Sequence, residues 1–189
     1  MTVDYVDPNG DVQKEWNSAC PNHYECIDGG VRQPAAPTSD NINAVDGDEN
    51  DIDRFYLTSL PDVQEVTSVK IWIYGNNTTG EHCLVDLQMG SLEPWEGYQT
   101  VNMDSGYAWF SKTFNGSWTQ TNLDQCQVRF KADSAYGKFD TTWIRAFYCE
   151  VTYSEVPTGY SHKVNGVLPA HIGKINGVPT AHIAKVNGV

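Results

Sequence analysis

Basic residues are scarce in this 189-residue chain: Lys and Arg number 12 against 24 Asp and Glu, for a formal net charge of −12. Nucleic acid and anionic membrane surfaces bind basic patches, so neither is expected as a partner. No apolar run reaches the roughly 18 residues that a membrane span requires. The six Trp and ten Tyr exclude a disordered acidic segment.

Catalytic signatures are also missing. The sequence contains no G-x-S-x-G, no H-E-x-x-H, no phosphate-binding glycine-rich loop and no dinucleotide fingerprint. None of the five His lies in a recognisable nucleophile or base context. A glycosidase-like pair of acids is the one catalytic arrangement that the sequence leaves open. We therefore expect a protein that is not an enzyme.

The five cysteines include no C-x-x-C, which removes support for zinc or thioredoxin-like sites. Cys83, Cys126 and Cys149 fall on the apolar faces of expected strands, which favours buried, inert thiols. Cys20 and Cys26 would pair in an oxidising medium or remain free in a reducing one. The first residues have neither the basic nor the apolar segment of a secretory signal, so folding in a cytoplasm is expected.

What the sequence does contain is alternation of apolar and polar residues in many short segments, which predicts half-buried antiparallel strands. The segments are 54–58, 69–74, 83–89, 107–114, 126–132 and 143–153. Turn signals separate them at 75–80, 93–97, 115–116 and 135–137, and no segment predicts a helix. The pattern predicts an all-β fold, an antiparallel β-sandwich that is jelly-roll-like.

The end of the chain is an 11-residue repeat, in which Lys163-Val-Asn-Gly-Val167 recurs at 174–178 and 185–189. All 24 acidic residues precede it. Asn-Gly between β-branched residues predicts hairpins, yet the repeat has too few large side chains to bury a core. It is expected to pair with copies of itself, with the body or with another protein. The assembly residues are Lys163, Val164, Asn165, Gly166, Val167, Ile172, Lys174, Ile175, Asn176, Gly177, Val178, Ile183, Lys185, Val186, Asn187, Gly188 and Val189.

The shift in charge and the Pro/Gly punctuation near residue 157 divide the chain into three regions. Residues 1–40 are expected to form an N-terminal arm or extra strands. Residues 41–157 form the β-sandwich body, and residues 158–189 form a β tail for assembly or anchoring.

Two clusters could bind a ligand. Asp46, Asp48, Asn50, Asp51 and Asp53 could present several hard oxygens to calcium, although their spacing differs from that of an EF-hand loop. The alternative is a solvated acidic loop.

The second cluster is aromatic. Trp72 and Tyr74 lie opposite the apolar face of their strand, and Trp95 lies in a loop. Exposed aromatic rings of this kind stack on sugars, so these three residues are candidates for a glycan site. The alternative is that loops or another subunit cover them.

The body and the tail resemble β-sandwich modules of tailed-phage and prophage structural proteins, and the Lys-Ile-Asn-Gly-Val repeats that end virion-associated proteins. The matching residues are Asp46-Gly-Asp-Glu-Asn-Asp, Leu60-Pro-Asp, Val66-Thr-Ser-Val-Lys-Ile-Trp-Ile, Trp118-Thr, Leu123, Gln127-Val-Arg-Phe, Ile144 to Tyr153 and the tail repeats. The resemblance implies a virion structural protein, as a fibre, decoration or tail-associated subunit, and brings no catalytic residues.

The leading hypothesis is therefore a non-enzymatic virion protein, assembled in the host cytoplasm through its tail. Its partners would be copies of itself, other virion proteins and a host glycan. The alternatives are a carbohydrate-binding module and a self-polymerising extracellular filament subunit.

Overall fold

The computed structural model describes residues 1–18, 20–27, 31–37, 42–45, 51–78, 82–132, 141–155, 174–175 and 178–179. The chain divides into two compact units, Met1–Ser154 and Glu155–Val189. The division falls shortly before the boundary expected from the charge shift. In the described part, no helix is both long and apolar enough to cross a membrane.

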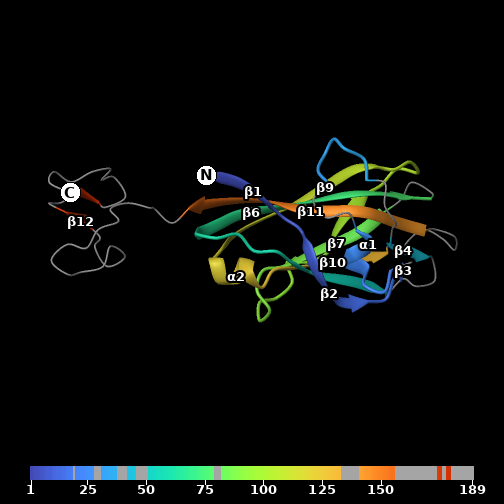
Figure 1. The fold of residues 1–189 in the computed structure, drawn as a ribbon, viewed down its shortest axis with the longest axis horizontal. Coiled ribbons are helices and arrows are strands. Elements are labelled where there is room, and N and C mark those ends of the chain that lie inside the picture. Colours follow the sequence, from blue (N-terminus) through green and yellow to red (C-terminus); the bar gives the residue numbers. More distant parts are fainter. Residues whose placement is uncertain are drawn as a thin grey trace. The chain divides into compact units, whose positions relative to one another are not determined.

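The first unit is a sandwich of two sheets (Figure 1). Sheet 1 contains β1 (Thr2–Val6), β3 (Asn17–Ser18), β4 (Ile42–Val45), β6 (Val63–Asn77), β9 (Ala108–Trp118) and β11 (Thr141–Glu155), in the order β3-β4-β11-β6-β9, with β1 also beside β11. Sheet 2 contains β2 (Pro8–Lys14), β5 (Ile52–Leu57), β7 (His82–Gln88), β8 (Gln99–Asn102) and β10 (Gln127–Ala132), in the order β2-β5-β10-β7-β8. Neighbouring strands such as β6 and β9, or β5 and β10, run antiparallel. The predicted antiparallel β-sandwich is confirmed.

The N-terminal region supplies strands to both sheets. β1 pairs with β11, where Val6 lies opposite Cys149, and β2 pairs with β5, where Pro8 lies opposite Leu57. Val6 and the nearby Trp16 are buried in the core. Residues 1–40 thus contribute extra strands that belong to the sandwich.

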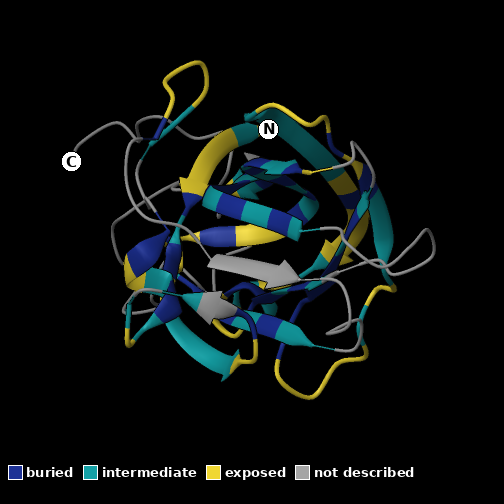
Figure 2. Cartoon of the chain, turned by 90° about the vertical axis from the view of Figure 1, so that its right-hand side faces the viewer, coloured by how far each residue is buried: buried dark blue, intermediate teal, exposed yellow. Residues whose placement is uncertain are grey.

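The core lies between the inner faces of the sheets, and its apolar residues come from alternate positions of the strands. Figure 2 shows buried and part-exposed residues alternating along them. Phe147 of β11 packs against Phe55 of β5 and Phe130 of β10, with ring centroids 5.2 Å and 5.0 Å away. Burying one such side chain contributes about 2 kcal/mol, so this cluster joins the two sheets.

The expectation that no segment is helical is wrong at two short places, α1 (His23–Cys26) and α2 (Gln120–Asp124). α2 begins after Thr119, whose side chain accepts a hydrogen bond from the backbone N–H of Asn122. The Asn122 side chain accepts from the Thr119 backbone in return, which completes a capping box. Capping residues determine where helices as short as these form. These helices contain too few residues for a helical periodicity to be visible in the sequence.

The turn expected at 115–116 is also wrong, because Asn115 and Gly116 lie within β9. The register of β9 against β6 shifts between Val66 and Ser68. The strand therefore continues through Asn115 and Gly116, and the register shift in the β6–β9 ladder accommodates them.

The three remaining cysteines, Cys83, Cys126 and Cys149, are buried thiols, as their positions on apolar strand faces predict. Burial raises the pKa of the Cys126 and Cys149 thiols. Both therefore remain protonated and unreactive at neutral pH.

Candidate functional site

The outer side of sheet 2 carries a cluster of aromatic and hydrogen-bonding side chains. Alternation along β5 places Asp53, Phe55 and Leu57 inside and leaves Arg54 and Tyr56 outside. We call the whole cluster the sheet 2 face, and its residues are Arg54, Tyr56, Asp86, Trp95, Tyr98, Gln127 and Arg129. Trp95 and Tyr98 come from the loop between β7 and β8, and the others from β5, β7 and β10.

Strand register places three charged side chains in one row across this face. Arg129 of β10 lies directly opposite Arg54 of β5 on one side and Asp86 of β7 on the other. Both the Nη2 and the Nε of Arg129 donate to Asp86 Oδ2, at 2.7 Å and 3.2 Å. The Asp86 side chain is fully buried, while Arg129 keeps some exposure. A buried carboxylate with this pairing fixes its arginine firmly.

The fixed guanidinium of Arg129 in turn positions two aromatic rings. It lies 3.9 Å from the ring centroid of Trp95 and 4.4 Å from that of Tyr98. Such cation–π contacts stabilise a ring on a surface by roughly 0.5–2 kcal/mol. The burial of Tyr98 raises the pKa of its phenol.

Two hydrogen bonds to backbone carbonyl groups hold the loop that carries Trp95. The Gln88 side chain donates to the carbonyl of Glu93 at 2.7 Å, and the Glu96 N–H donates to the carbonyl of Leu87 at 2.9 Å. The loop therefore returns to β7 on both sides of Trp95. Trp95 remains partly exposed, so its ring is held in place and still accessible.

Tyr56 gives the face a second accessible ring. Its side chain is 45% exposed, and the residue opposite it on β2 is Gly10. A Cβ at Gly10 would lie 3.9 Å from Tyr56 Cδ2. The Tyr56 ring therefore packs over Gly10, which has no side chain of its own. Beside it, Arg54 donates from Nε to Gln127 Oε1 at 2.5 Å and lies 5.3 Å from the Trp95 centroid.

The three residues expected to form the glycan site lie on two different sheets. Trp72 and Tyr74 share the outer side of sheet 1, whereas Trp95 belongs to the sheet 2 face. Trp72 donates to Glu150 Oε2 at 3.1 Å and stacks on Tyr148 with centroids 6.3 Å apart. The structure therefore does not bring the three together.

Part of the outer side of sheet 1 is covered by the segment 31–37, whereas Trp72, Tyr74 and Trp109 remain partly exposed. Arg32, in the segment 31–37, places its guanidinium 4.4 Å from the Tyr148 ring and pairs with Asp7 at 2.7 Å. Trp109 Nε1 donates to the carbonyl of Ala35 at 2.8 Å. Tyr148 is only 3% exposed although it points away from the core. Its burial raises its pKa.

The candidate calcium residues are only partly described, since Asp46, Asp48 and Asn50 lie outside the described residues. Asp53 is fully buried, and its Oδ1 accepts from the backbone N–H groups of Glu15 and Trp16 at 2.8 Å and 2.9 Å.

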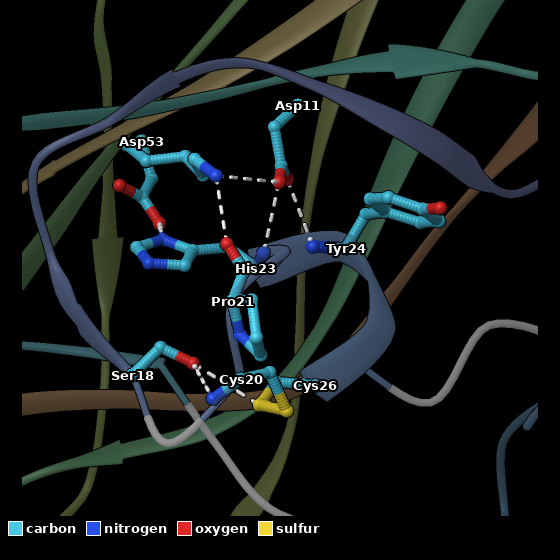
Figure 3. Close-up of a disulfide and its surroundings, with 9 residues drawn as sticks. Asp11, Ser18, Cys20, Pro21, His23, Tyr24, Cys26 and Asp53 are labelled. Atoms are coloured by element: carbon cyan, nitrogen blue, oxygen red, sulfur yellow. Dashed lines mark hydrogen bonds and ion pairs between the residues drawn. A yellow bond between two sulfur atoms is a disulfide. The ribbon is translucent and has the colours of Figure 1, made fainter.

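The other carboxylate oxygen of Asp53 contacts His23 Nδ1 (Figure 3). Burial raises the pKa of Asp53 above its ordinary value, against the opposing effect of these hydrogen bonds. Both oxygens of Asp53 are thus occupied by protein donors. No group of three or more His, Cys, Asp or Glu able to hold a metal exists within the described ranges. The calcium site, including Asp51, stays a prediction.

Cys20 and Cys26 form a disulfide, with Cα atoms 5.7 Å apart, so the paired alternative is the one observed. The bridge closes the loop that contains α1 (Figure 3). The carboxylate of Asp11 accepts from the backbone N–H groups of His23 and Tyr24, each at 2.9 Å, and so caps the start of α1.

In the tail, one repeat is described in part. β12 (Lys174–Ile175) pairs antiparallel with β13 (Val178–Pro179), and Ile175 lies opposite Val178. This pairing across Asn176-Gly177 confirms the hairpin expected at this repeat. The other assembly residues lie outside the described part, and what the tail contacts stays a prediction.

Most of the sheet 2 face was not found from the sequence. The alternation in 126–132 places Arg129 outward, which is the one available signal. The pairing of Arg129 with Asp86 and the packing of Trp95 over Arg129 join segments that are 43 and 34 residues apart in the chain, respectively, and no local pattern shows such contacts.

Comparison with known proteins gives architectural likeness only. No protein-family model matches the chain, and no curated protein matches it. Among solved structures, it is similar to the CBM36-1 domain of a multidomain xylanase from the hindgut metagenome of Trinervitermes trinervoides, with TM-score 0.42 and 11% identity over 82% of this chain and 100% of that one.

It is also similar to a family 29 carbohydrate-binding module, with TM-score 0.41 and 12% identity over 79% of this chain and 90% of that one. A variant of such a module matches with TM-score 0.42 and 10% identity, over 82% and 92% of the two chains.

Proposed function

We propose that the chain is a non-enzymatic carbohydrate-binding protein whose ligand site is the sheet 2 face. The observation that supports this most is Trp95, a partly exposed ring held over Arg129, whose partner Asp86 is buried, on the same face as the exposed ring of Tyr56. Sugar rings present C–H groups that stack on aromatic faces, and hydroxyl groups that bind fixed polar side chains. The sheet 2 face offers both, on β5, β7 and β10 and on the loop between β7 and β8.

Strands β5, β7 and β10 of this face do not offer the arrangement that glycoside hydrolysis needs. Hydrolysis requires two carboxyl groups about 5–10 Å apart on either side of the bond. Asp86 is the only acid among the outward residues of β5, β7 and β10, and its carboxylate already forms an ion pair with Arg129. Binding without turnover is therefore the function that this geometry favours.

Replacing Trp95 by Ala is expected to weaken polysaccharide binding about 30-fold, because an anchoring aromatic residue contributes roughly 2 kcal/mol. Tyr56→Ala is expected to weaken it by a similar factor. Affinity electrophoresis against a panel of soluble plant and bacterial polysaccharides, followed by calorimetry, measures this effect.

Leu92→Ala is the matched control, because Leu92 lies in the same loop and is 96% exposed. It should bind like the wild type. If Trp95→Ala and Tyr56→Ala bind normally while Trp72→Ala does not, the site lies on sheet 1 and the proposal is wrong.

The tail hairpin supports a second, compatible function, which is assembly into a larger structure such as a virion or a filament. β12 and β13 have two residues each, too few to be stable in isolation, and among the described strands each pairs only with the other. Deleting residues 158–189 should convert an oligomer into a monomer in light scattering. An unchanged mass for the shortened chain would contradict the assembly role.

A further inference from the structure

We propose that the sheet 2 face selects sugars that carry a carboxylate, and that Arg54 is the residue that binds this group. The expected ligand is a polysaccharide containing uronic acid. This inference rests on the proposed function and names its ligand class.

The charge distribution on the face is the first argument. The chain has twice as many acidic as basic residues, yet Asp86 is the only acid among the outward residues of β5, β7 and β10, and the nearby Glu15 is bound to the Ile52 N–H and to the Gln13 side chain. Asp86 is already paired with Arg129. No carboxylate among the described residues lies within ion-pair distance of Arg54. Arg54 is therefore a cation without a counter-ion in the described part of the protein.

The hydrogen bonding of Arg54 is the second argument. Its Nε donates to Gln127 Oε1, and Gln127 is only 1% exposed, so the guanidinium is held from below by a fixed acceptor. Within the described ranges, neither Nη atom makes a hydrogen bond. The two Nη atoms of an arginine form a planar fork that matches a carboxylate. The protein thus orients Arg54 and leaves its terminal donors for a ligand.

The position of the neighbouring rings is the third argument. Tyr56 lies two residues from Arg54 on the same side of β5, and side chains at this spacing are about 7 Å apart. A carboxylate at the edge of a stacked pyranose, together with its hydrogen bonds to a guanidinium, spans a distance of this order. A sugar stacked on Tyr56 can therefore direct its carboxylate at Arg54, whose guanidinium lies 5.3 Å from the centroid of the Trp95 ring.

The net charge of −12 does not oppose this selectivity at contact distance. Charges farther apart than about 8 Å are largely screened at physiological ionic strength. The bond between Arg54 and a carboxylate is short-range and charge-assisted, and such bonds are roughly twice as strong as those to neutral hydroxyl groups. The local contact therefore decides which sugar binds.

The test compares acidic polysaccharides with neutral forms of the same polymers. Polygalacturonate, alginate, hyaluronate and glucuronoxylan are each measured by calorimetry beside their carboxyl-reduced forms, using the full chain. The wild type is expected to bind at least one acidic form about tenfold or more tightly than its reduced partner. Arg54→Gln should bring this ratio close to one, and Arg54→Lys should restore part of it. Thermal melting of each variant confirms that it is folded.

The inference is overturned if the wild type binds acidic and reduced forms equally, or if Arg54→Gln keeps the preference. Equal binding that still depends on Trp95 overturns only the choice of acidic sugars and leaves carbohydrate binding in place. No binding to any acidic or neutral polysaccharide overturns both.

Discussion

Replacing Asp53 by Ala is expected to lower the free energy of unfolding by about 3–5 kcal/mol. The carboxylate is fully buried and accepts from the backbone of Glu15 and Trp16 and from His23. Truncation leaves these buried donors without an acceptor. It also removes the link between β5 and the N-terminal segment that leads to α1.

Urea denaturation of the purified variants measures this loss. Asp104→Ala is the control, since its side chain is exposed and the change should stay within about 0.5 kcal/mol. Asp53→Asn keeps an oxygen for the two backbone donors and should therefore lose less than Asp53→Ala. A loss in Asp53→Ala equal to that of the control would show that the buried network does not stabilise the fold.

The second large effect is expected at Gly75, inside β6. A Cβ on this residue would lie well inside van der Waals contact of the Trp143 carbonyl oxygen, which belongs to β11. Because the obstacle is backbone, it cannot be relieved by turning a side chain. Gly75→Ala should force the two strands apart and cost about 3 kcal/mol of unfolding free energy.

Gly106→Ala provides a matched comparison, because a Cβ there would have no heavy atom within 4 Å. Its melting temperature should stay within a few degrees of that of the wild type. Equal melting temperatures for Gly75→Ala and Gly106→Ala would mean that β6 and β11 do not approach as closely as the structure has them.

The strands of the body could be predicted because their patterning is local. The alternation of Val69, Ile71 and Ile73 with Trp72 and Tyr74 corresponds to the inner and outer sides of β6. The N-terminal strands escaped firm prediction because β2 is mainly polar and because Val3 and Tyr5 of β1 are exposed. β1 and β2 are held by pairing with β11 and β5, which the sequence does not show.

The site was less predictable than the fold, because it depends on contacts between distant segments. An outward aromatic residue on a strand is recognisable, but whether a loop covers it is not. The segment around Arg32 covers Tyr148 beside Trp72, whereas the loop of Trp95 leaves Tyr56 exposed. The ion pair beneath Trp95 exists only because β10 and β7 are neighbours in sheet 2.

The position of the glycan site is tested most directly by nuclear magnetic resonance, following backbone amides and Trp indole N–H groups while a soluble oligosaccharide is added. The oligosaccharide is the tightest binder from the acidic and neutral panels. Chemical-shift changes are expected at Trp95, Tyr56 and Arg54 and along β10, with Trp72 and Trp109 unmoved. Changes confined to the outer side of sheet 1, or no changes with any sugar, would contradict carbohydrate binding at the sheet 2 face.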